Sequence, residues 1–190
     1  MDNWILKYYQ HIKDGTITTG RWIQMLYEKI IADLENHAVY FDQKKANRAV
    51  EFMESFLHHS KGHLAPQLIR LEEWQKAMIS CIFGLVDENG IRKYKEVLCV
   101  VGRKCGKSLI ASGIGEYMAY ADGEYGADVY FLAPRMEQTE IVFNGFWQSV
   151  SMEPSLASIT KKRKTDIYIP RTNTSIRKIA FSQKKSDGFN

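Results

Sequence analysis

The chain has 190 residues, of which 45% are hydrophobic and 25% charged, which is enough apolar material for one or two domains with a buried core. No apolar run approaches the ~18 residues that span a bilayer, so the composition excludes a helical membrane protein. The three cysteines are odd in number and form no Cys-x-x-Cys pair, which argues against a disulfide framework and indicates reduced thiols in a cytoplasmic protein.

Residues 1–60 show the apolar spacing of helices. Gly15 to Gly20 separate the first helix from the second, and Asp42 is the expected N-cap of the third. We predict an N-terminal helical region over residues 1–65, ended by a linker at 61–66. Two stripes with a period of three to four residues are expected to pack in its core: Trp22, Met25, Leu26, Ile30 and Leu34, and then Ala49, Phe52, Met53 and Phe56.

Beyond residue 66, helices alternate with strands. This order is typical of a parallel sheet with helices on its faces. The predicted elements are a helix over 70–86, a strand near 96–101, a helix over 107–121, a strand over 128–133, a helix over 137–151, and two strands near 166–170 and 175–181 with a turn at 172–174.

The segment that joins the first of these strands to its helix carries the strongest chemical signal. The apolar run Val97–Val101 leads into Gly102-Arg103-Lys104-Cys105-Gly106-Lys107-Ser108. A tight loop at a helix start binds phosphate through backbone N–H groups, so Gly102 to Leu109 form the predicted nucleotide site. The Lys107 ammonium is expected to reach the β- and γ-phosphates, and the Ser108 hydroxyl to bind Mg²⁺.

The loop departs from the usual pattern at its first glycine. Val101 stands where that glycine is expected, and Gly102 comes one residue late. A surface turn that contains Gly-Lys-Ser by chance is therefore the alternative. The strand, loop and helix context favours the phosphate site, and with it an α/β fold: a helical region followed, over residues 66–190, by the first part of a P-loop NTPase-type parallel sheet with flanking helices.

With its neighbouring segments, this loop resembles the ATPase part of the large terminase subunits of tailed bacteriophages, the motors that pump double-stranded DNA into procapsids. The resemblance covers roughly residues 37–190 and implies ATP hydrolysis with ATP and Mg²⁺ as cofactors. It rests on the loop and on Leu71-Glu72-Glu73-Trp74-Gln75, Ile82-Phe83-Gly84, Tyr130-Phe131-Leu132-Ala133-Pro134-Arg135 with Gln138, and the segment from Ser182 to Asn190.

The resemblance assigns further roles. Arg103 matches an arginine of the family's loop and is expected, with Lys107, to act in catalysis, since a guanidinium beside the γ-phosphate stabilises charge in the transition state. Gln75 matches an adenine-reading glutamine, whose amide both donates and accepts; the alternative is a polar residue on an exposed helix face. Lys104 is expected to face solvent or DNA, and Cys105 and Gly106 complete the backbone of the loop.

The resemblance also implies partners. These are double-stranded DNA, a small terminase subunit, a portal protein and further copies of the chain assembled on the portal, in the cytoplasm of a bacterial host and without a membrane. The protein is then a phage or prophage product.

Hydrolysis needs an Asp for Mg²⁺ and a Glu for water, on a strand that follows the loop. The one apolar run that ends in Asp-Glu, Ile82 to Glu88, precedes the loop and is expected to be a helix end. In the family, the acidic strand begins just beyond the position of Asn190 and a nuclease domain follows it. We therefore expect an N-terminal portion that binds nucleotide weakly, hydrolyses little and self-associates through an incomplete sheet.

The net charge of +4 is unevenly spread. Residues 161–190 carry +7 and residues 1–160 carry −3, and the basic surplus is densest at 161–164. This cluster predicts either a solvated turn or a contact with a polyanion such as DNA. Two other functions stay open: a helicase-type or other P-loop translocase on nucleic acid, and a non-enzymatic DNA-binding or capsid-associated module in which Gly-Lys-Ser is incidental.

Overall fold

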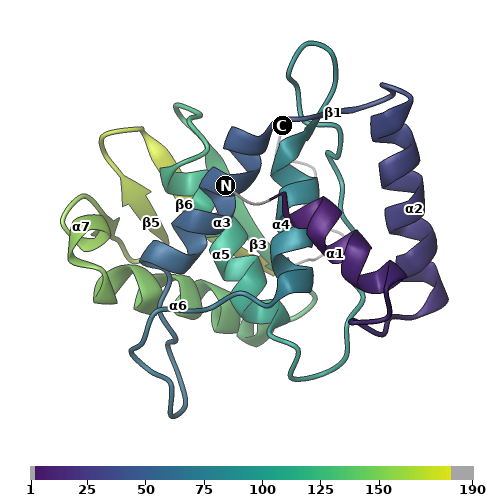
Figure 1. Ribbon diagram of the computed structural model, residues 1–190. Coiled ribbons are helices and arrows are strands. Elements are labelled where there is room, and N and C mark those ends of the chain that lie inside the picture. The colour runs from purple at the N-terminus through teal and green to yellow at the C-terminus, as the bar shows by residue number, and fades with distance from the viewer. Residues whose placement is uncertain (1–2, 181–190) are drawn as a thin grey trace. The chain divides into compact units, whose positions relative to one another are not determined.

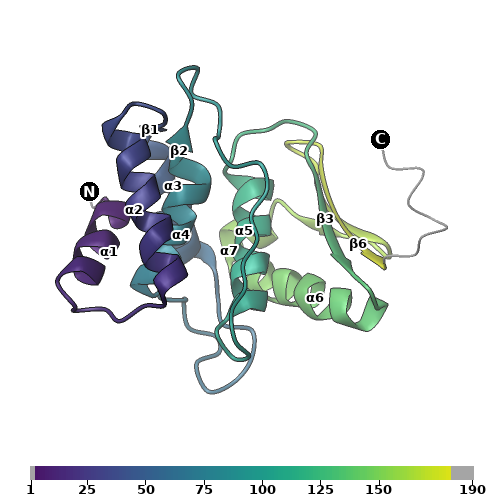
Figure 2. The same cartoon turned by 90° about the vertical axis from the view of Figure 1, so that its right-hand side faces the viewer.

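The computed structural model describes residues 3–180, which divide into two compact units (Figures 1 and 2). Unit 1 is formed by the described part of residues 1–51 and by 70–100, and unit 2 by 52–69 and the described residues from 101 onward. The units are defined by packing, and the division into domains at residue 65 stays a prediction. Among residues 3–180, no helix is both long and apolar enough to cross a bilayer.

The elements have the following bounds. The helices are α1 (Trp4–Lys13), α2 (Arg21–Glu35), α3 (Gln43–Phe56), α4 (Glu73–Gly84), α5 (Lys107–Tyr120), α6 (Met136–Met152) and α7 (Pro154–Ala157). The strands are β1 (Tyr40–Phe41), β2 (Leu85–Val86), β3 (Asp128–Ala133), β4 (Lys161–Lys162), β5 (Asp166–Ile169) and β6 (Thr174–Ala180).

Unit 1 is mostly helical. Helices α1, α2 and α4 pack around one apolar core, and the His11 Nδ1 lies 2.8 Å from Glu73 Oε1, which joins α1 to α4. The short strands β1 and β2 pair antiparallel, with Tyr40 opposite Val86. The predicted helix over 70–86 ends early because Leu85 and Val86 form β2. The buried core residues are Ile5, Tyr8, Ile12, Tyr27, Ile30, Val39, Ala77, Cys81 and Leu85.

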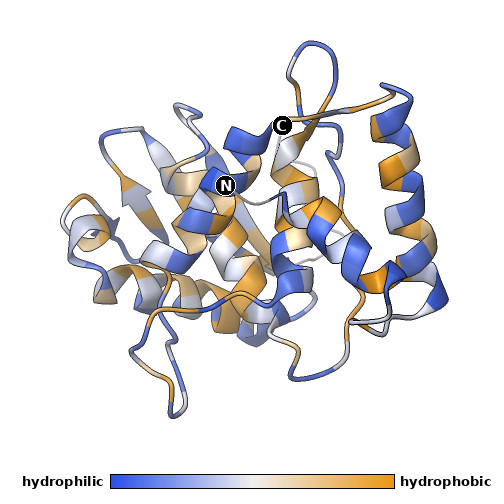
Figure 3. Ribbon diagram, in the orientation of Figure 1, coloured by the Kyte–Doolittle hydropathy of each residue, from blue (hydrophilic) through white to orange (hydrophobic). Residues whose placement is uncertain are grey.

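The predicted core stripe of α2 is partly wrong. Trp22 is 77% exposed and Leu26 47% exposed, whereas Tyr27 and Ile30 are buried. The Tyr27 ring meets the Tyr8 ring of α1 edge to face at 4.9 Å, and this contact turns the apolar residues of the first α2 turns toward solvent. Figure 3 shows the resulting mixture of apolar and polar residues around α2. The stripe of α3 is confirmed at Ala49, Phe52 and Met53, which are buried.

The strand predicted near 96–101 is absent from the described part of the chain. Residues 96–100 belong to no strand, and the side chains of Leu98 and Val100 are 89% and 83% exposed. A strand is held by hydrogen bonds to a neighbouring strand, and among residues 3–180 nothing pairs with this run. The apolar segment ahead of the loop is therefore exposed, not buried.

Unit 2 contains a four-stranded sheet in the order β3-β6-β5-β4. Strand β3 pairs parallel with β6, as predicted, while β6, β5 and β4 are antiparallel, so the sheet is mixed. The predicted strands near 166–170 and 175–181 form the hairpin β5–β6, and the predicted strand over 128–133 is β3. Residue 181 and the segment from Ser182 to Asn190 lie outside the described residues.

Helices α5 and α6 lie on one side of β3 and β6 (Figure 2). The rings of Phe131 on β3 and Phe146 on α6 have centroids 6.0 Å apart, and Phe146 is fully buried. Gly115 permits the close approach of α5, because a Cβ at this position would lie 2.7 Å from Phe131 Cζ. This packing fixes α5, and with it the loop that precedes α5, on the sheet.

Candidate functional site

The loop before α5 has the backbone of an anion site. Gly106 is the N-cap of α5 and has a φ of 72°, in the left-handed region that favours glycine. Lys104, two residues earlier, also has a positive φ of 65°. Alternating backbone conformations of this kind turn successive N–H groups toward one concavity. No side chain caps α5, so the N–H groups of its first turn, at Lys107, Ser108 and Leu109, are available to a ligand.

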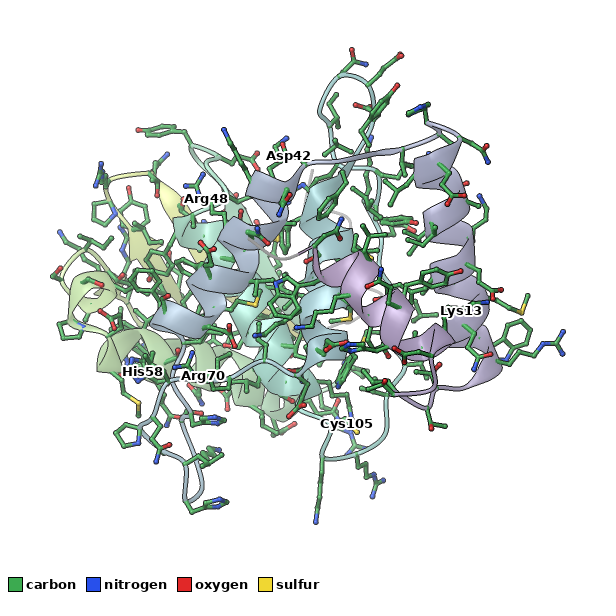
Figure 4. All side chains as sticks on the ribbon, viewed as in Figure 1. Lys13, Asp42, Arg48, His58, Arg70 and Cys105 are labelled. Carbon is green, nitrogen blue, oxygen red and sulfur yellow. The ribbon has the colours of Figure 1, made fainter. Side chains whose placement is uncertain are left out.

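The lysine of the motif closes the loop on itself. Lys107 Nζ donates a hydrogen bond to the carbonyl oxygen of Gly102, 3.1 Å away, so the ammonium lies across the loop. The Cys105 thiol makes a second internal contact, at 3.8 Å from the carbonyl oxygen of Arg103. Figure 4 marks Cys105 in this loop. A Cβ at Gly102 would meet only Cys105 Sγ at 3.7 Å, so the displaced glycine is not demanded by packing.

The remaining loop side chains are open to solvent. Arg103, Lys104 and Ser108 are exposed, and neither cation forms an ion pair within residues 3–180. The segment that leads into α5 thus carries a guanidinium, two ammonium groups and a hydroxyl, and no ion pair neutralises its cations among residues 3–180. Positive charge at this end of a helix adds to the potential of the helix dipole and favours a polyanion.

Gln75 already has a structural role. It is the third residue of α4, and its Oε1 accepts a hydrogen bond from the Glu72 N–H at 2.9 Å, while the Glu72 side chain accepts from the Gln75 N–H. This reciprocal arrangement is a capping box. Gln75 belongs to unit 1 and the loop to unit 2, and its contact with adenine stays a prediction.

The Asp-Glu pair ahead of the loop is part of a turn. Asp87 Oδ1 accepts hydrogen bonds from the N–H groups of Asn89 and Ile91, each at 2.9 Å. The carboxylate is thus used to hold the Asp87–Ile91 turn. This agrees with a structural role for the pair, but the pair follows β2 and does not lie at the predicted end of a helix. Within residues 3–180, no three His, Cys, Asp or Glu side chains gather to hold a metal ion.

Sequence reasoning missed a buried acid on α5. Glu116 is fully buried, and it accepts hydrogen bonds from Ser112 Oγ at 3.2 Å and from Ser149 Oγ at 3.1 Å. Burial raises the pKa of the Glu116 carboxyl to about 8, opposed by the two serine hydrogen bonds. The available signal was a single acidic residue in the otherwise uncharged stretch from Ser108 to Tyr120.

The basic cluster at 161–164 is exposed and contacts aromatic rings. Lys162 Nζ lies 5.1 Å from the ring centroid of Trp147, and the Arg163 guanidinium lies 3.8 Å from that of Tyr168. Arg163 also approaches the buried Asp166 at 3.5 Å. Cation–π contacts hold two of the four cations in place, while their charge stays accessible.

Comparison with known proteins places this loop in a family. Residues 73–190 match the model of the family described as terminase large subunit, ATPase domain. None of the curated proteins compared with the chain matches it. A solved structure, the crystal structure of the HK97 bacteriophage large terminase, is similar with a TM-score of 0.66 and 21% sequence identity. The similarity covers 77% of this chain and 29% of that one, and it shows a shared fold. Because the family model matches more than half of its residues, including the whole loop and α5, the chain belongs to the terminase large subunit family.

Proposed function

We propose that this chain supplies the nucleotide-binding part of an ATP-driven motor that packages double-stranded DNA into phage procapsids. The observation that carries the proposal is the loop Gly102–Ser108, with left-handed Gly106 at the start of α5 and the Lys107 ammonium lying across it. Family membership supports the same activity. The chain spans 29% of the HK97 protein, so the activity of the whole motor is part of the proposal.

The hydrogen-bond donors of the loop fit a nucleoside triphosphate with Mg²⁺. Backbone N–H groups from Gly102 to Leu109 bind phosphate oxygens, and Lys107 exchanges its bond to the Gly102 carbonyl for bonds to the β- and γ-phosphates. The Ser108 hydroxyl would hold Mg²⁺, which neutralises phosphate charge when bound. Arg103 stabilises the charge that develops on the γ-phosphate during transfer to water.

Gln75 reads adenine in this proposal. Its Oε1 caps α4, and its amide NH₂ is the group that donates to the base. The side-chain oxygen of Gln75 has a second lone pair, so it can accept a hydrogen bond from adenine while it still accepts the capping bond from Glu72. Replacing Gln75 therefore affects both the start of α4 and the preference for ATP over GTP.

Little hydrolysis is expected from residues 1–190 by themselves. Asp87 is engaged by the N–H groups of its own turn, and within residues 3–180 no strand after the loop presents an Asp-Glu pair. The chain then binds ATP and Mg²⁺ without efficient activation of water. In the motor, the small terminase subunit, the portal protein and further copies of the large subunit are the proposed partners, in the cytoplasm of the bacterial host.

DNA is proposed to contact the basic cluster at 161–164. Phosphate contacts need accessible cations, and Lys161 and Lys164 form no ion pair among the described residues. The Trp147 and Tyr168 rings hold the neighbouring cations in fixed positions. A nucleic-acid translocase of helicase type would use similar chemistry, but the family match favours packaging.

Binding of a fluorescent ATP analogue tests the proposal. The wild-type chain is expected to bind it in the presence of Mg²⁺, and Lys107→Ala to bind it at least ~10-fold more weakly, since a charged hydrogen-bond donor to phosphate is lost. Lys61→Ala, which removes the same charge from another exposed loop, is the matched control and retains full affinity. Equal affinity in the wild type and Lys107→Ala would instead support a module in which Gly-Lys-Ser is incidental.

A further inference from the structure

The helix that follows the loop Gly102–Ser108 is anchored by a buried acid that has no cationic partner among residues 3–180. Glu116 lies on α5 and is fully buried. Its Oε1 accepts from Ser112 of the same helix, and its Oε2 accepts from Ser149 of α6. A carboxylate in an apolar interior is strongly disfavoured unless it is paired, so this site favours the neutral acid. The pKa of about 8 caused by burial agrees with that geometry.

The same network reaches a third segment of unit 2. Ser149 Oγ, which donates to Glu116, accepts a hydrogen bond from the His58 N–H at 3.1 Å. The Glu116 carboxyl thus links α5 to α6 and, through Ser149, to the chain that follows α3. Packing here is close, because a Cβ at Gly113 would lie 2.5 Å from Leu57 Cδ2. Helix α5 cannot shift without breaking these contacts.

The buried network and the phosphate loop share one face of α5. Ser108, Ser112 and Glu116 follow one another at intervals of four residues, which places them along one strip of the helix. Glu116 lies about 12 Å from Ser108 along the axis, at ~1.5 Å per residue. A helix transmits a change in docking as a rigid body, so the position of Lys107 and Ser108 depends on how α5 is held at Glu116.

We propose that Glu116 is a positioning residue which, as a neutral acid, holds the phosphate-loop helix in its binding geometry, so that nucleotide binds more tightly when the Glu116 carboxyl carries a proton than when it is ionised. The inference rests on the proposed nucleotide-binding function. An ionised Glu116 weakens the docking of α5 and adds a negative charge behind a loop that binds a polyanion. By linkage, bound nucleotide raises the pKa of Glu116 in turn.

Other titratable groups near the network differ from Glu116 in their partners. Tyr120, one turn further along α5, is hydrogen-bonded to Thr160 at 2.7 Å, and burial raises its pKa further above its usual value. Tyr120 therefore stays neutral at the pH values at which Glu116 titrates. His58 Nε2 lies 3.5 Å from Glu153 Oε2, and this pair does not touch the Glu116 carboxyl. Where α5 packs on the sheet at Gly115, the neighbouring side chains are the apolar Phe131 and Val129 of β3. Glu116 is thus the buried carboxyl of this interface.

The test is the pH dependence of nucleotide affinity in the 190-residue chain. The dissociation constant of a fluorescent ATP analogue with Mg²⁺ is measured from pH 6.5 to 9.5 for the wild type and for Glu116→Gln. Gln is a neutral isostere that keeps one acceptor oxygen and has an NH₂ donor where the protonated acid has its O–H. Over this range the wild-type constant is expected to rise about three- to tenfold more than that of Glu116→Gln, the size expected for one charge at about 12 Å. All other titratable groups are common to the two proteins, so their difference isolates Glu116. Glu124→Gln removes an exposed carboxylate and follows the wild-type profile.

Parallel pH profiles for the wild type and Glu116→Gln would overturn the inference, even if the variant changed thermal stability. No binding by the wild type at any pH would overturn the proposed function itself. If Glu116→Gln does not fold, a second variant tests the same inference. Ser149→Ala removes a hydrogen bond that favours the carboxylate. The nucleotide affinity of this variant is therefore expected to fall at a higher pH than that of the wild type. Ser151→Ala, an exposed serine of the same helix, leaves the profile in place.

Discussion

The ammonium of Lys107 lies 3.1 Å from the carbonyl oxygen of Gly102, so the last basic residue of the loop bonds to the first glycine. This bond spans the backbone that is proposed to receive phosphate. It holds the loop folded and keeps the cation beside the N-terminus of α5. A triphosphate offers the same ammonium stronger, charged acceptors. In the proposed nucleotide complex, the Lys107 ammonium exchanges the Gly102 carbonyl for phosphate oxygens.

Gly106 sets the direction in which the loop enters α5. Its φ of 72° is strained for any residue with a Cβ, so Gly106→Ala is expected to lower the free energy of unfolding by about 1–2 kcal/mol. Gly102→Ala is the control, because a Cβ there meets only Cys105 Sγ at 3.7 Å. Chemical denaturation measures both variants. Equal losses in the two would contradict the backbone argument.

Glu116 predicts a stability that depends on pH. Its pKa is about 8 in the folded chain and about 4.5 in the unfolded one, so between these values the folded state holds a proton that the unfolded state has released. The free energy of unfolding therefore falls as the pH rises through this window, by at most ~1.4 kcal/mol per pH unit. Glu116→Gln is expected to remove this slope and to exceed the wild type in stability at pH 8. Denaturation of both proteins at pH 5 and pH 8 checks the sign, and a wild type with no steeper decline than the variant would refute it.

Replacement by alanine is expected to have opposite effects on stability at two helical glycines, Gly84 and Gly145. A Cβ at Gly84 would lie 2.6 Å from Ala46 Cβ and 2.8 Å from Phe41 Cε2, so Gly84→Ala is expected to destabilise unit 1 by about 1–3 kcal/mol. Gly145, inside α6, has no atom within 4 Å of that position. Gly145→Ala is expected to stabilise by about 0.5–1 kcal/mol through helix propensity. Thermal unfolding separates the two, and a stabilising Gly84→Ala would show that the contact around Gly84 is loose.

The exposed apolar run ahead of the loop predicts self-association. Leu98 and Val100 are 89% and 83% exposed, and the edge of β3 that faces away from β6 has no partner strand among residues 3–180. Exposed apolar chain and open strand edges promote association. Light scattering is expected to give a mass that rises with concentration and falls in the double variant Leu98→Ser, Val100→Ser. Tyr125→Ser, which removes a single exposed ring, serves as the control. A wild type that stays monomeric over the whole concentration range is the contrary result.

The basic cluster predicts a salt-dependent affinity for double-stranded DNA. Each phosphate contact adds about 0.9 to the slope of log affinity against log salt concentration. The double variant Lys161→Ala, Lys164→Ala is expected to reduce the slope by up to ~2, because two accessible cations are lost. Lys61→Ala, from another exposed loop, keeps the wild-type slope. If the double variant also kept it, the DNA contact would have to be sought elsewhere on the chain.

The sequence determined the features that depend on short stretches of chain. Local periodicity and turn chemistry predicted the helix that begins at Lys107, the strand over 128–133 and the two strands after residue 165. The loop Gly102–Ser108 belongs to this class, because a glycine, a lysine and a helix start define it within a few residues. Its family could be identified from the same local motifs.

Only the tertiary structure decided what each apolar or charged residue faces. Val97 to Val100 have the composition of a buried strand, yet a strand exists only where another strand pairs with it. The orientation of α2 was set by the contact of Tyr27 with Tyr8, and the burial of Glu116 by the approach of Ser149 from another helix. These outcomes depend on partners distant in sequence, and periodicity specifies a face of a helix or strand but not the element that will cover it.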